Sequence, residues 1–190
     1  MERYYADDKT FEKIDFRKDP LQQGDYESCR FINCNFSDSD LSDSHFSECE
    51  FTGCNLGMTR LMKTTLQDVK FKDCKLLGLH FNDCNKFLFT VDFENCSISV
   101  CSFYKLSMKR TRFKNSTLRE VDFAETDLTA SIFDDCDLTG TMFDNTILEK
   151  VDFITSHNYS IDLDKNRIKK AKFSATGLAG LLDKYDIEIG

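Results

Sequence analysis

The fold of this chain is decided by a stretch between Cys29 and Gly53, which divides into five groups of five residues: CRFIN, CNFSD, SDLSD, SHFSE and CEFTG. The third residue of each group is apolar, and we call it the centre of the repeat. Fifteen consecutive centres from Phe11 to Phe81 are apolar, and after a slip of two residues fourteen more run from Leu88 to Phe153. Sixteen of the 18 Phe residues occupy centres, which 41% hydrophobic composition cannot produce by chance. A five-residue repeat therefore organises the chain.

The period of five predicts a coil with four sides. It matches neither the 3.6-residue period of a helix nor the two-residue period of a strand, so each pentapeptide is expected to form one side and one corner. After the slip the centres alternate between aliphatic residues and Phe, and like residues stack only if a turn has an even number of sides. Four sides, about 20 residues per turn, place Phe in two columns at the ~4.8 Å spacing of paired strands. These columns are Phe93, Phe113, Phe133, Phe153 and Phe173, and Phe103, Phe123 and Phe143.

The positions around the centres carry a motif. Two residues before the centre the side chain is small or β-branched at most positions, and all nine Cys residues fall there. The residue just before the centre is often Asp or Asn, as at Asn35, Asp40 and Asp122. From about Phe11 to Phe173 the chain thus resembles the pentapeptide-repeat family, whose motif is A(D/N)LXX. The resemblance implies an all-β fold, a right-handed quadrilateral β-helix of about eight 20-residue coils, over residues 1–173.

Two segments interrupt the repeat. The slip at residues 82–88 inserts two residues at one corner, which is either a tolerated bulge or a contact site that presents Lys86, Phe87 or Phe89. A second disturbance, at residues 156–161, is expected to be a short loop before the last coil.

The C-terminal segment, residues 174–190, changes period. Leu178, Leu181, Leu182 and Tyr185 are spaced as in an amphipathic helix, so we expect a helix at about 175–185 with Ser174 or Thr176 as N-cap, followed by an extended tail. Such an end caps the last coil. It also resembles the ends of Qnr-type quinolone-resistance and microcin-immunity members of the family, which implies a homodimer through this segment. The expected interface residues are Leu178, Leu181, Leu182, Tyr185, Ile187 and Ile189.

No arrangement in the sequence indicates an enzyme, a metal site or a cofactor. Cys34, Cys54, Cys74 and Cys96 would form one column of parallel side chains, which suits neither a tetrahedral zinc site nor disulfides, so Cys is expected to be a small buried apolar residue. The three His residues are expected to face outward on different sides or coils. No Gly-rich phosphate loop or nucleophile motif occurs.

Charge is distributed in bands. The 33 acidic and 25 basic residues give a net charge of −8, which argues against direct nucleic-acid binding. Residues 120–152 contain ten acids and one base, flanked by basic stretches at 105–119 and 165–172. This band is either solvated surface or an acidic surface offered to a basic partner. Its candidate partner-binding residues are Glu120, Asp122, Glu125, Asp127, Asp134, Asp135, Asp137 and Asp144.

Two functions of different class are compatible with these features. The resemblance to Qnr-type proteins implies a DNA-mimicking protector or modulator of the type II topoisomerases DNA gyrase and topoisomerase IV. The alternative is a structural or interaction scaffold for another cytoplasmic protein. The acidic N-terminus and the lack of any apolar run near ~20 residues predict a cytoplasmic protein without membrane contact.

Overall fold

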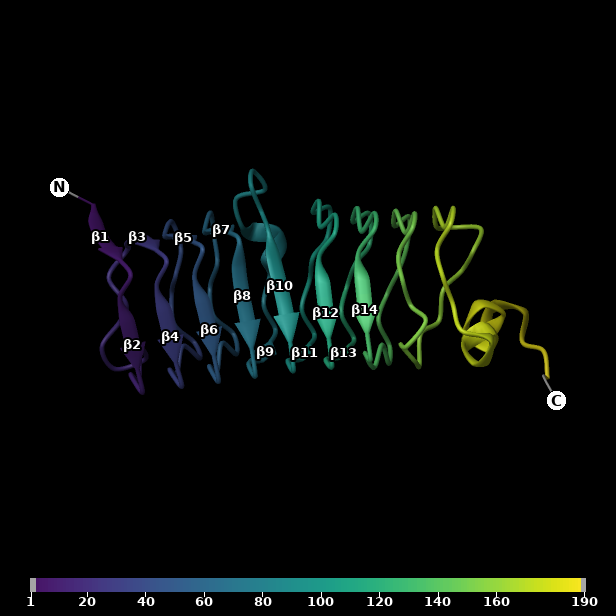
Figure 1. Ribbon diagram of the computed structural model, residues 1–190, viewed down its shortest axis with the longest axis horizontal. Helices are drawn as coiled ribbons and strands as arrows, with labels where there is room; N and C mark the ends of the chain where they lie inside the picture. Colours follow the sequence, from purple (N-terminus) through teal and green to yellow (C-terminus); the bar gives the residue numbers. More distant parts are fainter. Residues whose placement is uncertain (1–2, 189–190) are drawn as a thin grey trace.

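The computed structural model describes residues 3–188 and shows an elongated parallel β-solenoid, in which the chain winds from the N-terminal to the C-terminal end (Figure 1). Its regular strands make about seven turns, and isolated bridges such as Asp152–Lys172 continue the winding. The Phe31–Phe51 and Phe113–Phe133 pairings both join residues 20 positions apart, which confirms the expected four-sided turn. No helix within residues 3–188 is long and apolar enough to span a bilayer.

Three of the four sides carry sheets, and we name each side after its first strand. The β1 face has the order β1-β3-β5-β7, the β2 face has β14-β12-β10-β8-β6-β4-β2, and the β9 face has β13-β11-β9. The fourth side, the bridge face, pairs through bridges such as Ser102–Asp122. The strands are β1 Tyr4–Asp7, β2 Thr10–Glu12, β3 Gly24–Glu27, β4 Arg30–Ile32, β5 His45–Ser47, β6 Glu50–Thr52, β7 Thr65–Gln67, β8 Val69–Lys72, β9 Lys75–Leu77, β10 Val91–Glu94, β11 Ser97–Ser99, β12 Arg112–Lys114, β13 Thr117–Arg119 and β14 Ile132–Asp134.

The core consists of stacked aromatic rings. Phe113 stacks on Phe93 with centroids 5.0 Å apart and on Phe133 at 4.7 Å, and the column continues to Phe173. A second column runs from Phe81 through Phe143. Both expected columns are therefore confirmed, and neighbouring columns meet edge to face, the preferred geometry for aromatic pairs.

The corners hold the chain in the left-handed region. In the described residues, 26 non-glycine residues have φ between +48° and +63°, most of them two positions after a centre, and Gly53, Gly78 and Gly140 share this conformation. This geometry turns the chain from one side of the coil onto the next. It is least costly for Asp, Asn and Gly and most costly for a β-branched residue such as Val100.

The slip differs from the expectation in one respect. The β8–β10 pairing joins Val69 to Val91, 22 positions apart, so two residues are inserted. The five-residue count makes Leu88 a centre and therefore predicts that it is buried. Phe89 fills this core position instead and is 6% exposed, whereas Leu88 is 52% exposed. The expectation that Phe89 lies on the surface is wrong, because its ring packs into the core edge to face with the ring of Phe81, at a centroid distance of 6.2 Å. A 3-10 helix, η1 (Phe81–Asp83), forms the start of the inserted segment.

The C-terminal end is helical, but in two 3-10 segments, η2 (Ala175–Leu181) and η3 (Asp183–Tyr185). Ser174 is the N-cap, and its hydroxyl accepts a hydrogen bond from the Gly177 N–H at 3.1 Å. The Ile161 N–H donates to the Gly180 carbonyl at 2.9 Å, which joins η2 to the last coil. A side chain at Gly180 would collide with the Tyr159 carbonyl, so this close approach requires glycine.

Candidate functional site

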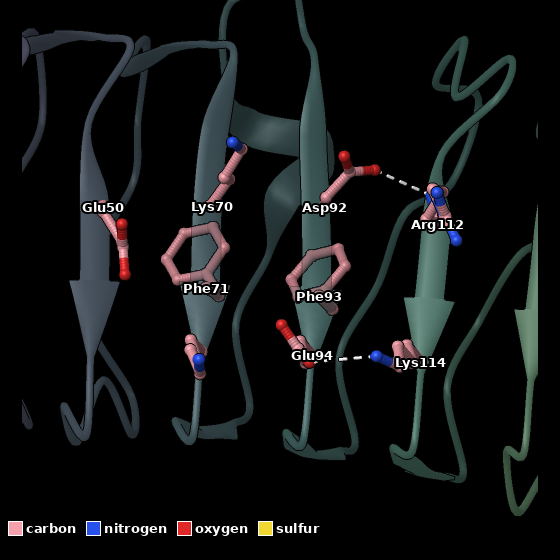
Figure 2. A pocket seen from close by; sticks show the side chains of 9 residues that line it. Glu50, Lys70, Phe71, Asp92, Phe93, Glu94, Arg112 and Lys114 are labelled. Carbon is pink, nitrogen blue, oxygen red and sulfur yellow. Dashed lines mark hydrogen bonds and ion pairs between the residues drawn. The ribbon is translucent and has the colours of Figure 1, made fainter.

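An open groove of about 470 Å³ lies on the β2 face (Figure 2). Acidic and basic side chains alternate along it, as in the row Glu50, Lys70, Asp92 and Arg112. Lys114 and Glu94 lie 3.3 Å apart across β12 and β10. Each charge thus neighbours opposite charges on the adjacent coils, which stabilises the sheet and leaves the groove without a single-sign field.

The nine Cys residues line the core and not the surface. All are buried with free thiols, and the thiol of Cys54 donates a hydrogen bond to the Phe31 carbonyl at 3.2 Å. Burial raises the pKa of Cys136 to about 12, so this thiol stays protonated at neutral pH. Within residues 3–188 no group of three His, Cys, Asp or Glu side chains is arranged to hold a metal ion. His45, His80 and His157 are exposed and lie on three different sides, which agrees with the expectation of outward-facing His.

The structure does not bring the eight acids of the 120–152 band onto one side. They are distributed over all four faces. Asp134 and Asp135 lie on the β2 face, Glu120 and Asp137 on the β9 face, Asp122, Glu125 and Asp144 on the bridge face, and Asp127 on the β1 face. No continuous acidic stripe therefore forms from this band.

Several acids of the band have local structural roles. Asp122 and Asp127 accept hydrogen bonds from the backbone N–H two residues ahead, at 2.8 and 3.0 Å, which closes the turn at each corner. Partial burial of Asp127 opposes its ionisation, but hydrogen bonds from Thr129 and Lys109 outweigh it and lower its pKa. Glu125 is paired with Lys105 at 3.3 Å. These contacts neutralise or occupy much of the charge that sequence analysis assigned to a partner.

A more coherent acidic surface lies on the N-terminal half of the β1 face. Asp25 there is paired with Arg3 at 2.8 Å, and Asp8 with Arg30 at 3.5 Å. Four further acids are exposed and have no Lys or Arg partner among the described residues. These acids are Asp7, Glu27, Glu48 and Asp68.

Sequence reasoning missed this acidic surface because its members are about 20 residues apart and never form a run. Sorting the charges by their position within the 20-residue turn would have found them, since Glu48 and Asp68 occupy one corner column.

The loop formed by residues 82–88 projects from the middle of the β1 face (Figure 1). We call it the insertion loop. Its tip exposes Phe87 and Leu88, with 74% and 52% of their surfaces accessible, and Lys86 beside them is also exposed. Two adjacent exposed apolar residues next to an acidic surface form a candidate anchor for a protein partner.

Beyond the insertion loop the β1 face becomes basic. Bridges from Ser107 through Asp127 and Ile147 to Arg167 continue this face toward the C-terminal end. Lys109 and Arg167 are paired with Asp127 and Glu149, whereas four exposed bases have no acidic partner among the described residues. These bases are Arg110, Lys150, Lys169 and Lys170. The two halves meet at the loop, where Asp68, Thr90 and Arg110 line one hollow of about 250 Å³.

The candidate interface residues at the C-terminal end have different environments. Leu181 is buried against the last coil and Leu182 is half-buried, so the cap occupies part of the expected apolar stripe. Leu178, Tyr185 and Ile187 are exposed. Ile189 lies outside the described residues. The α-helical spacing expected for this stripe does not hold, because the segment forms two 3-10 helices with three residues per turn.

Comparisons with known proteins agree on the architecture. The family model of the pentapeptide repeat region matches residues 25–87 and 86–173. No curated protein matches the chain.

Solved structures include similar solenoids. A trypsin-treated variant of QnrB1, a plasmid-mediated fluoroquinolone resistance protein, aligns with a TM-score of 0.72 and 15% identity over 98% of this chain and 92% of that one. Full-length QnrB1 aligns with a TM-score of 0.55 and 14% identity over 97% of this chain and 100% of that one. HetL, from the cyanobacterium Nostoc sp. strain PCC 7120, gives a TM-score of 0.32 and 13% identity over 90% of this chain and 87% of that one. At these identities the QnrB1 alignments show a common fold.

Proposed function

Because the chain belongs to the pentapeptide-repeat family, we propose that it is a non-enzymatic protein-binding rod whose partner is a DNA-binding protein. The first candidate partner is a type II topoisomerase, DNA gyrase or topoisomerase IV. One observation carries this proposal, namely the exposed Phe87 of the insertion loop beside the unpaired acids Glu27, Glu48 and Asp68 of the β1 face. An apolar anchor with acids on one side complements a basic protein surface that contains an apolar pocket.

The magnitude of the charge requires the contact to be local. A rod of about eight coils is ~40 Å long and a tail-to-tail dimer ~80 Å, a length over which B-DNA carries roughly 47 charges. The net charge of −8 gives such a dimer only −16. The protein therefore replaces DNA on one patch of a basic surface and does not imitate a whole duplex.

We further propose that two copies meet at their C-terminal ends, as the resemblance to Qnr-type proteins implies. Leu178, Tyr185 and Ile187 are the residues free to make this contact, since Leu181 packs within its own chain.

A supercoiling assay with purified gyrase or topoisomerase IV, with and without ciprofloxacin, tests the topoisomerase proposal. The wild-type protein at micromolar concentration should reduce supercoiling or restore it in the presence of the drug. Glu27→Lys with Glu48→Lys, and separately Phe87→Ala, should weaken the effect at least tenfold. Glu120→Lys with Asp135→Lys is the matched control on other faces and should retain it. If neither enzyme responds to the wild-type protein, the topoisomerase proposal fails.

The second candidate is a scaffold for a different protein partner. The dispersal of the 120–152 acids over four faces favours it, because a DNA mimic benefits from a continuous acidic stripe. Pull-down with the same variants separates the two functions. A partner other than a topoisomerase that is lost with Phe87→Ala and kept by the control variant would support the scaffold.

A further inference from the structure

The β1 face has opposite charge in its two halves, and the insertion loop marks the boundary. On the N-terminal side the unpaired charges are Asp7, Glu27, Glu48 and Asp68, and on the C-terminal side they are Arg110, Lys150, Lys169 and Lys170. The four acids and the four bases thus occupy one side of the rod. Nothing in the linear order of charges indicates this, because the intervening residues of each turn lie on the other three sides.

The charges also share columns. Glu48, Asp68, Arg110, Lys150 and Lys170 all occupy the corner that follows the β1 face, where each has a positive φ. Glu27 and Lys169 both lie one position before that corner. Consider a two-fold axis that passes through the insertion loop, lies in the plane of the β1 face and is perpendicular to the rod. Rotation about this axis gives an antiparallel second copy in which each column lies opposite the same column of the first copy. It then places the acidic half of one copy opposite the basic half of the other.

We infer that two copies of this chain associate in antiparallel fashion through the β1 face, with the two-fold axis near the insertion loop. Counted in coils from the loop, Asp68 then faces Arg110 of the partner copy and Asp7 faces Lys169 of the partner copy. A parallel arrangement would place acid against acid. The antiparallel one is isologous, the commonest symmetry of homo-oligomers.

The insertion loop supplies the apolar part of this contact. It projects from the middle of the face, so the exposed Phe87 and Leu88 of both copies come together beside the axis. An apolar centre with a charged rim is the usual anatomy of a protein interface.

The size of the face predicts a weak, salt-sensitive contact. A face about 40 Å long and about 10 Å wide offers on the order of 400 Å² per copy, about half of what a stable interface uses on each side. Exposed ion pairs are screened by salt. The contact covers the acids that the proposed function assigns to a partner, so the two associations compete. The self-association is inferred from the charge pattern and the exposed insertion loop, and it does not depend on that function.

Two variants, each with the charges of one half of the β1 face reversed, test the inference. The first variant combines Glu27→Lys, Glu48→Lys and Asp68→Lys, and the second combines Lys150→Glu, Lys169→Glu and Lys170→Glu. Sedimentation equilibrium is measured for the full chain in about 50 mM and 500 mM NaCl, with Leu178→Asp and Ile187→Asp in all samples to remove the tail contact. Circular dichroism verifies that each variant is folded.

We expect copies with the wild-type β1 face to associate at low salt. Their association constant should fall at least tenfold at high salt. Each variant alone should be monomeric, because its two halves carry the same sign. An equimolar mixture of the two variants should form a heterodimer. A control with Asp38→Lys, Glu120→Lys and Asp135→Lys, which makes the same change of net charge on other faces, should not associate with the second variant. The inference would be overturned by any of three results. These are a protein with the wild-type β1 face that is monomeric at low salt, an association that survives in both charge-reversal variants, or a mixture of the two variants that stays monomeric.

Discussion

The hydroxyl of Thr126 donates a hydrogen bond of 2.8 Å to the backbone carbonyl of Phe103, 23 residues earlier. The same bond recurs from Thr59 to Phe36, from Ser131 to Met108 and, with a thiol donor, from Cys74 to Phe51. It explains why the position two before each centre takes Cys, Ser or Thr. The residue must be small enough to fit at a buried corner, and a donor there satisfies a carbonyl of the previous turn.

Replacement of Thr126 by Val, which keeps the shape and removes the donor, should lower the free energy of unfolding by about 1 kcal/mol. The loss is moderate because the Phe103 carbonyl also accepts from the Leu106 N–H. Urea denaturation measures it, and Thr126→Ser is the control that should stay closer to wild type. A valine variant as stable as wild type would show that this bond contributes nothing.

Replacement of Phe133 by Ala should cost about 3–5 kcal/mol, the range for buried Phe. Its ring is 1% exposed and is stacked between Phe113 and Phe153. Phe87→Ala, in which an exposed ring is removed, should change stability by less than about 0.5 kcal/mol. A loss below about 1 kcal/mol for Phe133→Ala would contradict its role in the core.

Replacement of Val100 by Gly should stabilise the protein by up to about 1 kcal/mol. Val100 is a β-branched residue with φ of 54° and is 57% exposed, so it has a conformational cost and little packing. Removing a left-handed strain of roughly 1–2 kcal/mol outweighs the extra flexibility of Gly in the unfolded chain. Ile132→Gly, at an exposed strand position, should destabilise instead. Thermal unfolding compares the two, and equal effects would refute the strain argument.

The C-terminal cap should loosen in acid. The Lys184 ammonium lies 2.7 Å from Asp162 and lowers the pKa of that carboxyl below its ordinary value. A depressed pKa means that the contribution is present above the unfolded value of about 3.9 and is lost as pH falls through the folded pKa. The carboxyl carbon shift of Asp162 in NMR should therefore titrate below pH 3.9. Lys184→Met should move its midpoint up toward that value, and an unchanged midpoint would exclude the contact.

The C-terminal contact between copies should depend on the exposed residues of the cap. Leu178→Asp with Ile187→Asp should yield monomers at high salt, measured by light scattering. Leu181→Asp should instead unfold the cap, because Leu181 is 7% exposed against the last coil. A dimer that persists at high salt in the double variant would place the interface elsewhere.

The core of this fold could be predicted because the five-residue period acts locally. Each pentapeptide puts the same two side chains inward, so the Phe columns, the buried Cys residues and the Ser174 cap follow from position in the repeat. The prediction failed at Leu88 and Phe89. An insertion breaks the link between position and side, and which ring returns to the core depends on the space beside Phe81.

The sequence by itself determined the four-sided coil, since a repeated apolar centre has only one way to bury itself along the whole chain. The tertiary structure alone decided which charges are neighbours, because stacking joins residues 20 positions apart and separates those in one run. It dispersed the acids of residues 120–152 over four faces and brought Glu27, Glu48 and Asp68 together on one. The surface most suited to a partner was therefore set by the winding of the chain, and the linear order of its charges did not reveal it.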